Sequence, residues 1–276
     1  MDPRENSGCL RVGLIGLGSI GSYIARSIMN GEAPGTTLIA AADPISPSQD
    51  LIQELQDHSV TIVDSFSSLL NLPLKVVLEC ANQKVVQMCA ASFLSKGISL
   101  IIMSIGALIQ DSFYSDLVTK ANENGCRIYI PSGAVGGIDA LKAARLSGLE
   151  EVTLTTRKPP RSLGKIEGID LDHLIEPLVI YEGKAIEAVV RFPQNVNVAA
   201  TVSLAGVGPD RTSVRVIADP TIDKNIHEIQ ARGAFGSFSI RLTNNPSPQN
   251  PKTSLLACSS VLSLLKTIQE TVQIGT

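Results

Sequence analysis

Three glycines near the start of the chain, Gly16, Gly18 and Gly21, have the spacing of a phosphate-binding turn. They follow a short apolar, β-prone run at 10–15 and precede isoleucines at 20, 24 and 28 that share one helix face. In that context the glycines permit a tight turn, close approach of a diphosphate and close helix packing. The start of the helix, at Ser19 and Ile20, would offer free N–H groups to phosphates. The alternative is a structural turn that binds nothing.

Asp43 ends the next β-prone run, 37–42, about twenty residues beyond Gly21. A carboxylate there can accept both ribose hydroxyls of an adenosine and would repel a 2′-phosphate. The pattern therefore favours NAD as the cofactor, with NADP possible because Ser46 and Ser48 could accommodate a phosphate. Alternatively, Asp43 only starts an Asp-Pro turn.

The chain has three histidines, the residue type whose ordinary pKa suits proton transfer at neutral pH. His58 and His173 lie in polar stretches and are expected at the surface. His227 lies between strand-like segments, where it could be a buried, hydrogen-bonded side chain or a catalytic one. The sequence alone leaves these two interpretations open.

Strands and helices alternate as far as Pro131, which indicates βαβ units and a parallel, doubly wound sheet. We therefore predict an α/β protein with an N-terminal Rossmann domain at 1–132. Ala81 and Ser104 follow predicted strands at the sheet edge where ligands bind, so we expect them near the cofactor. Their small size could instead reflect packing only.

A glycine-rich turn follows Pro131, and a helix is predicted over 138–146. Beyond it, strand-like runs at 152–156, 187–192, 213–218 and 238–242 tend to alternate polar and apolar residues. This pattern predicts a second, α+β domain at 133–252 with a mainly antiparallel sheet. We expect it to carry the substrate and catalytic residues and a dimer contact. A last helix within 253–276 is expected to pack back on the first domain.

Composition excludes several functional classes. The formal net charge of −3, without a basic stripe, does not suggest a nucleic-acid partner. The five cysteines show no C-x-x-C spacing, which argues against a metal site and fits a reducing compartment. No membrane span and no apolar signal segment is evident, so we expect a cytoplasmic protein.

Several segments, taken in order, resemble the L-aspartate dehydrogenase family, which is related to the homoserine dehydrogenase type of two-domain reductase. They include PSGAVGGIDAL at 131–141 and FPQNVNVAA at 192–200. The others lie at 79–81, 104–108, 156–159, 203–206, 218–220, 225–227, 233–236 and 250–254. The resemblance runs from the first domain almost to the end of the chain.

The resemblance implies reversible oxidative deamination of L-aspartate with NAD or NADP. The first product, iminoaspartate, is either hydrolysed to oxaloacetate and ammonia or used in quinolinate synthesis on the route to NAD. His227 takes the place of the family's catalytic histidine, as general acid/base or as the group that orients the hydrolytic water. Ala134 and Asn197 match its NAD-contacting residues.

Aspartate carries two carboxylates, so its pocket needs donors. Lys252, Thr253 and Ser254 precede the last predicted helix and would make an anion site there. A plain helix N-cap at Thr253 or Ser254 is the alternative. Arg157 and Lys158 are second candidates for binding the carboxylates.

Two competing functions remain open at this stage. One is a reductase of a related small acid or semialdehyde with the same cofactor domain. The other is a catalytically silent NAD-binding sensor protein. By resemblance, a homodimer is also expected.

Overall fold

The computed structural model describes residues 8–45, 47–164, 166, 168–192, 197–247 and 250–275, without the side chains of 250–252. The chain divides into two compact units. The first comprises Met1–Pro131 and Ser260–Gln273, and the second comprises Ser132–Ser259 and Ile274–Thr276. Helix α8 (Leu255–Thr267) contributes its first residues to the second unit and the rest to the first.

The first unit alternates strands with helices. Its elements are β1 (Leu10–Ile15), α1 (Ser19–Met29), β2 (Thr36–Ala42), α2 (Gln49–Asp57), β3 (Thr61–Val63), the 3-10 helix η2 (Phe66–Asn71), β4 (Val76–Glu79), α3 (Gln83–Ser95), β5 (Ser99–Ile102), the 3-10 helix η3 (Ile105–Ile109), α4 (Asp111–Glu123) and β6 (Ile128–Tyr129).

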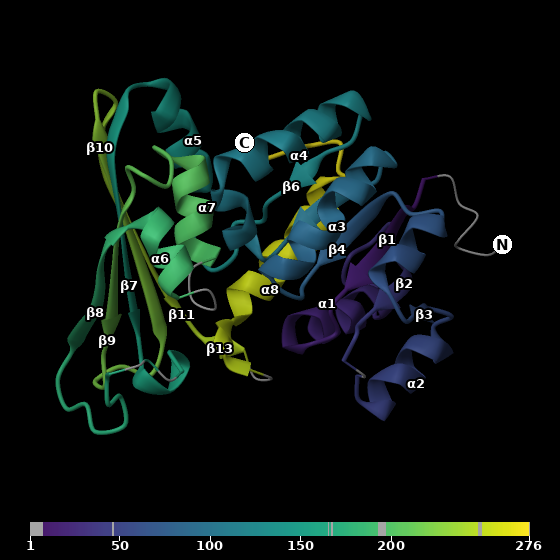
Figure 1. Ribbon diagram of the computed structural model, residues 1–276, viewed down its shortest axis with the longest axis horizontal. Coiled ribbons are helices and arrows are strands. Elements are labelled where there is room, and N and C mark those ends of the chain that lie inside the picture. The colour runs from purple at the N-terminus through teal and green to yellow at the C-terminus, as the bar shows by residue number, and fades with distance from the viewer. Residues whose placement is uncertain are drawn as a thin grey trace. The chain divides into compact units, whose positions relative to one another are not determined.

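Its six strands form one parallel sheet in the order β3-β2-β1-β4-β5-β6. Strand order reverses between β1 and β4, which is the switch point of a Rossmann sheet. Because crossovers between parallel strands are right-handed, α1 and α2 cover one face and α3 and α4 the other (Figure 1). The central strands are apolar and almost fully buried, as expected for a sheet covered on both faces. The predicted α/β fold is confirmed.

The second unit begins with the predicted helix. Its elements are α5 (Ile138–Leu146), β7 (Leu149–Lys158), the 3-10 helix η4 (Pro160–Ser162), β8 (Leu178–Lys184), α6 (Ala185–Arg191), α7 (Asn197–Ala205), β9 (Ser213–Ala218), β10 (Asn225–Gly233), β11 (Gly236–Asn244), β12 (Pro246–Ser247) and β13 (Asn250–Ser254).

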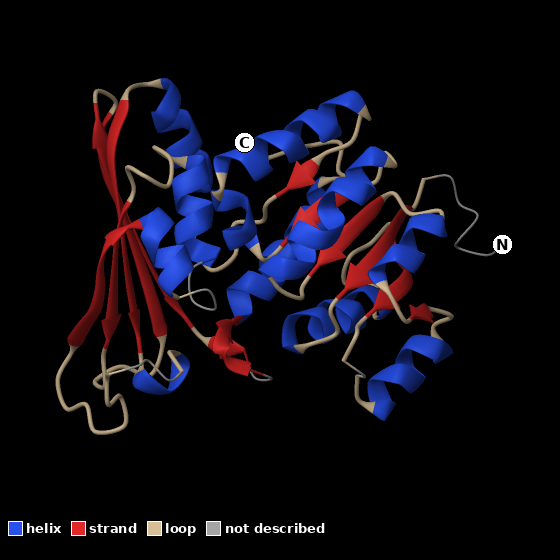
Figure 2. Cartoon of the chain, viewed as in Figure 1, coloured by secondary structure: helices blue, strands red, loops and turns tan. Residues whose placement is uncertain are grey.

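Its main sheet has the order β11-β10-β7-β9-β8, and only β7 and β9 are parallel neighbours. Figure 2 shows α5, α6 and α7 together on one side of this sheet. The strands alternate accordingly: on β7, Val152, Leu154 and Thr156 are buried, whereas the residues between them are more exposed. Strand β7 therefore presents one face to the helices and a polar face away from them.

One prediction about this unit is wrong. Residues 187–192, predicted as a strand, lie mostly in α6, because Ala185, Ala188 and Val189 are the buried positions and have helical spacing.

Thr253 and Ser254 precede the last helix, as predicted. They lie in strand β13, which pairs with β12, and helix α8 begins at Leu255. The Oγ atom of Ser254 has no hydrogen-bond partner, so the Ser254 side chain does not cap the helix.

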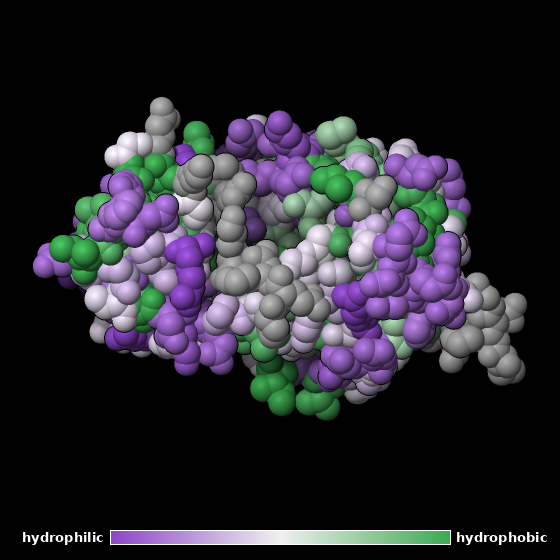
Figure 3. All heavy atoms as spheres, turned by 90° about the horizontal axis from the view of Figure 1, so that it is seen from below, coloured by the Kyte–Doolittle hydropathy of each residue, from purple (hydrophilic) through white to green (hydrophobic). Residues whose placement is uncertain are grey.

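Hydrophilic and hydrophobic residues are interspersed on the face of the molecule drawn in Figure 3. Large exposed apolar side chains, such as Met88, Leu146 and Val190, come from different helices. No helix in the described part of the chain is long and apolar enough to span a membrane.

Candidate active site

The glycine turn of the first unit joins β1 to α1, and each glycine has a distinct structural reason. Gly16 has φ +92°, and a Cβ there would lie 2.8 Å from the carbonyl carbon and oxygen of Cys80. A Cβ at Gly21 would overlap the carbonyl oxygen of Gly16. A Cβ at Gly18 would meet no protein atom within 4 Å. Gly16 and Gly21 are thus required by packing, whereas Gly18 leaves open space at the turn.

That open space lies at the start of α1. Gly18 is the N-cap, and no side chain caps the helix. The first N–H groups of a helix have no partner within it, and the helix dipole favours an anion there. A glycine turn without a Cβ, followed by an uncapped helix start at Ser19 and Ile20, fits a diphosphate.

Asp43 lies directly beside this turn. Its Oδ2 accepts a hydrogen bond from the Leu17 N–H at 2.5 Å, and its Oδ1 accepts one from the Ile45 N–H at 2.8 Å. The carboxylate therefore starts the local turn and is also held against the glycine turn. Ser48 caps α2 through the Leu51 N–H, and Ser46 lies outside the described residues.

Ala81 and Ser104 follow β4 and β5, at the same edge of the sheet as the glycine turn. They are connected by Glu79, the last residue of β4, which is 2% exposed. Its Oε1 accepts from the Ala81 N–H at 2.8 Å and from Ser104 Oγ at 2.7 Å, and its Oε2 accepts from the Ser104 N–H at 2.9 Å. Glu79 was not among the predicted site residues. The signals for it in the sequence were a charged residue ending an apolar strand and its place in the segment 79–81 that resembles the family.

In the second unit, His227 lies within β10, not between strands. It is 3% exposed, and its Nδ1 lies 3.0 Å from Oγ1 of Thr156, its partner residue on β7. Burial, and then the positive charge of Lys158, lowers the pKa of His227 to about 3. The imidazole is therefore neutral at physiological pH.

Lys158 lies two residues after Thr156 on β7 and so shares the face of Thr156 and His227. It is 6% exposed, and burial lowers its pKa to about 8. Arg157 lies on the opposite face and forms an ion pair with Asp219 at 2.8 Å. Strand alternation thus separates the two cations that the sequence left as equal candidates, and only Lys158 lies beside the imidazole.

Two asparagines connect this face to Ala134. Asn225 precedes His227 by two residues and pairs with Asn244 of β11. The Nδ2 atom of Asn244 donates to the Ala134 carbonyl at 2.8 Å. Asn225 is 2% exposed, and its Oδ1 has no partner. The unsatisfied Oδ1 of Asn225 therefore belongs to the same strand as His227, and Ala134 is hydrogen-bonded to the residue opposite Asn225 on β11.

The remaining predicted residues lie elsewhere in the second unit. Asn197 is the first residue of α7, and its carbonyl accepts from the Thr201 hydroxyl at 3.0 Å. Thr253 and Ser254 lie on β13, which is close to η4, just beyond Lys158. The Lys252 side chain lies outside the described residues.

Other titratable groups do not compete with His227. His58 and His173 are exposed, as predicted. Burial raises the pKa of Cys89 to about 12 and that of Cys258 to about 11, so these thiols are protonated and unreactive. Among the described residues, no group of three or more metal-ligating side chains lies together.

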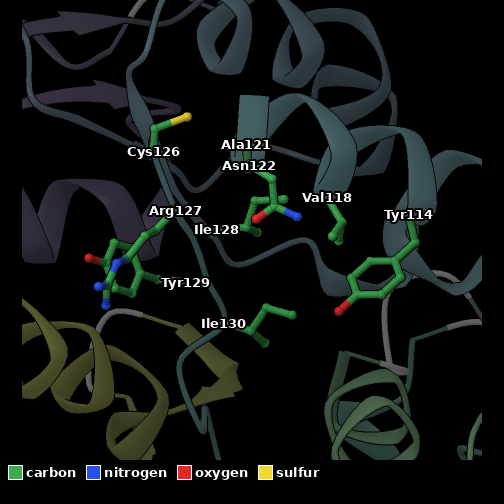
Figure 4. A pocket seen from close by; sticks show the side chains of 9 residues that line it. All are labelled: Tyr114, Val118, Ala121, Asn122, Cys126, Arg127, Ile128, Tyr129 and Ile130. Atoms are coloured by element: carbon green, nitrogen blue, oxygen red, sulfur yellow. The ribbon is translucent and has the colours of Figure 1, made fainter. Parts of the chain in front are cut away.

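A hollow of about 400 Å³ lies between α4 and β6 in the first unit (Figure 4). Tyr114, Asn122 and Tyr129 are among the residues that line it. It contains none of the predicted site residues and no carboxylate or imidazole, so it does not compete with the residues above as a catalytic site.

Two family models match the chain. The model described as "Homoserine dehydrogenase, NAD binding domain" matches residues 16–131, and the model described as "Aspartate dehydrogenase, C-terminal" matches residues 139–268. The first match agrees with the NAD cofactor expected from the glycine turn and Asp43, and the second covers the segment that contains His227 and Lys158.

Curated relatives match over nearly the whole length. The chain is 44% identical to an L-aspartate dehydrogenase of Methanosarcina acetivorans, over 97% of this chain and 100% of that protein. It is 38% identical to an L-aspartate dehydrogenase of Bradyrhizobium diazoefficiens, over 100% of this chain and 98% of that protein.

Among solved structures, aspartate dehydrogenase from Thermotoga maritima superposes with a TM-score of 0.77 at 29% identity, covering 96% of this chain and 99% of that one. A scyllo-inositol dehydrogenase from Lactobacillus casei, at 13% identity and a TM-score of 0.54 over 94% of this chain and 87% of that one, shares the fold. From its whole-length identity to curated relatives, the chain belongs to the L-aspartate dehydrogenase family.

Proposed function

We propose that the chain catalyses oxidative deamination of L-aspartate with NAD, giving iminoaspartate and then oxaloacetate and ammonia. The observation that carries this proposal is a buried, neutral imidazole beside a buried lysine on one face of the second unit's sheet. The whole-length similarity to L-aspartate dehydrogenases supports the same substrate. NAD, when bound, supplies the acceptor for the hydride that leaves the substrate.

The first unit provides most of the residues that we assign to the cofactor. Gly16, Gly18, Ser19 and Ile20 form the diphosphate cradle, and Asp43 would accept the ribose hydroxyls. Ala81 and Ser104, at the edge of the first sheet, and Ala134 and Asn197, in the second unit, are proposed as further contacts.

His227 handles protons in this proposal. If its Nδ1–H donates to Thr156, its Nε2 is unprotonated and can accept a proton or orient the hydrolytic water. Burial, and to a lesser extent the positive charge of Lys158, keeps the free imidazole a weak base. A substrate carboxylate bound at Lys158 would offset the second of these effects and raise the pKa of His227. Substrate binding would thereby make the imidazole a stronger base.

Lys158 is the cation that we assign to one substrate carboxylate, because it shares the face of Thr156 and His227 on β7, whereas Arg157 lies on the opposite face. Thr253, Ser254 and Lys252 are proposed for the second carboxylate. The buried Ser254 hydroxyl and the side-chain Oδ1 of Asn225 both lack hydrogen-bond partners. Donors or acceptors on a bound substrate would satisfy them.

A steady-state assay tests the function. Aspartate is measured against NAD and NADP separately at alkaline pH, where its amine is more often neutral. Homoserine, glutamate and oxaloacetate with ammonia complete the panel. We expect turnover with aspartate, and loss of at least a hundredfold in kcat for His227→Gln with an unchanged affinity for NADH. Turnover only with homoserine would favour the related reductase, and NADH binding without any turnover would favour the silent sensor protein.

We further propose a homodimer that forms through the polar face of the five-stranded sheet. A hollow of about 550 Å³ on this unit is lined by Glu151, Thr153, Gln230 and neighbouring residues of β7, β10 and β11. Light scattering after size-exclusion chromatography would give twice the 29.2 kDa of one chain, and a single-chain mass would contradict the proposal.

We propose the cytoplasm as the compartment, because none of the five cysteines forms a disulfide. Fractionation of the source cells, followed by detection of the chain in each fraction, tests this location. Recovery in an oxidising compartment would contradict it.

A further inference from the structure

Glu79 is a buried acid that the proposed chemistry does not use. It ends β4 at the point where the strand order reverses, between β1 and β5. Burial raises its pKa, while hydrogen bonds from Ser104 and Ala81 oppose that rise. No ion pair among the described residues includes it. A buried acid without a cation is expensive to keep, which calls for a specific reason.

The hydrogen bonds indicate that reason. Each carboxylate oxygen faces a different backbone N–H, that of Ala81 on one side and that of Ser104 on the other. Only a group with two acceptor oxygens can accept a hydrogen bond from both of these N–H groups. An amide in either orientation would turn its NH₂ toward one of the two N–H groups. The site therefore requires a carboxylate, not only a polar side chain of this size.

The two loops that Glu79 connects also adjoin the glycine turn. A Cβ on Gly16 would lie 2.9 Å from the Ala81 nitrogen, so the turn packs directly on the segment that Glu79 holds. The backbone N–H of Met103, next to Ser104, donates to the backbone carbonyl of Glu79 at 3.1 Å. A main-chain hydrogen bond thus also links Glu79 to the segment that contains Ser104. One side chain thus fixes the loops after β4 and β5 beside the diphosphate cradle.

We propose that Glu79 is a positioning residue for the cofactor: it holds Ala81 and Ser104 at the edge of the sheet in the arrangement that binds the dinucleotide. This inference rests on the proposed assignment of Ala81 and Ser104 to the cofactor site. Glu79 acts through these two residues and the loops they belong to.

The test is Glu79→Gln, with binding of NADH measured by calorimetry. We expect the Kd for NADH to rise at least tenfold, while the KM for aspartate at saturating NAD changes less than threefold. Amide hydrogen exchange of the cofactor-free protein should be faster in the peptides that contain Ala81 or Ser104 and unchanged elsewhere. Glu54→Gln is the matched control, because Glu54 bonds the partly exposed Arg26 in the same unit, and it should leave the Kd unchanged.

Each outcome is decisive. A purely structural acid would lower the melting temperature of Glu79→Gln but leave the NADH affinity of the folded protein intact, which would overturn the proposal. If Glu79→Gln does not fold, Glu79→Asp keeps a carboxylate but shortens the side chain, so that it cannot reach both N–H groups; a Kd raised about threefold supports the proposal, whereas an unchanged Kd contradicts it. A wild-type protein that binds NADH but does not oxidise aspartate would contradict the proposed function and leave this inference standing.

Discussion

Replacing Lys158 with methionine separates stability from substrate binding. Methionine keeps the length and apolar stem of the side chain but removes its charge. Burial lowers the pKa of Lys158 from 10.5 to about 8. At about 1.36 kcal/mol per pKa unit, the buried charge costs about 3 kcal/mol of stability at neutral pH. Lys158→Met should therefore stabilise the protein by up to about 3 kcal/mol at pH 7.

The pH dependence gives the sign of this effect. Between pH 8 and 10.5 the unfolded chain holds the lysine proton while the folded protein releases it, so the stability of the wild type rises with pH. The gain from Lys158→Met should be complete below pH 8 and should disappear near pH 10.5. Urea unfolding at pH 7 and at pH 9.5 measures the two values.

The same variant should bind aspartate poorly. A hydrogen bond between a carboxylate and a charged donor contributes about 1.5–3 kcal/mol, so the KM for aspartate should rise roughly 10- to 100-fold while the KM for NAD is unchanged. Lys120→Met on α4 is the control, because its partner Asp116 is an exposed neighbour on the same helix. A Lys158→Met protein that is less stable at pH 7, or that keeps the wild-type KM for aspartate, would refute the reasoning.

Three further predictions follow from the described contacts. Gly18→Ala should change the free energy of unfolding by less than about 0.5 kcal/mol, because its Cβ meets no protein atom, yet it should weaken NADH binding measured by calorimetry. Gly16→Ala should instead lower the free energy of unfolding by about 2 kcal/mol or more. If the two variants had equal effects on unfolding and on NADH binding, the assignment of the cradle would be contradicted. Asp43→Ser should raise the KM for NAD and lower that for NADP, measured by steady-state kinetics; an unchanged preference would assign Asp43 to its turn alone. Between pH 6.5 and about 3, His227 takes up a proton when the protein unfolds. The free energy of unfolding of the wild type should therefore fall by about 2 kcal/mol between pH 7 and pH 5, whereas that of His227→Gln should not show this fall. If the free energies of both proteins changed equally with pH, the imidazole would not be buried.

Local signals in the sequence were sufficient for much of the fold. The strand before the glycine turn and helix α5 have the predicted bounds, because apolar spacing and glycine positions act within a few residues. The resemblance to aspartate dehydrogenases and the NAD cofactor are confirmed by the whole-length relatives and the family models. Residues 187–192 were mistaken for a strand because adjacent valines suit both structures, and only packing against the sheet shows which is formed.

The sequence by itself determined that a glycine turn would join a buried strand to a helix, since that geometry is imposed by neighbouring residues. Tertiary structure decided which distant side chains meet. Sheet register places Thr156 beside His227, 71 residues apart, and strand alternation puts Lys158 on their face and Arg157 on the other. Parallel pairing brings the end of β4 next to that of β5, so that Glu79 can accept from Ser104. Such contacts depend on how separate strands align, and no spacing along the chain encodes that alignment.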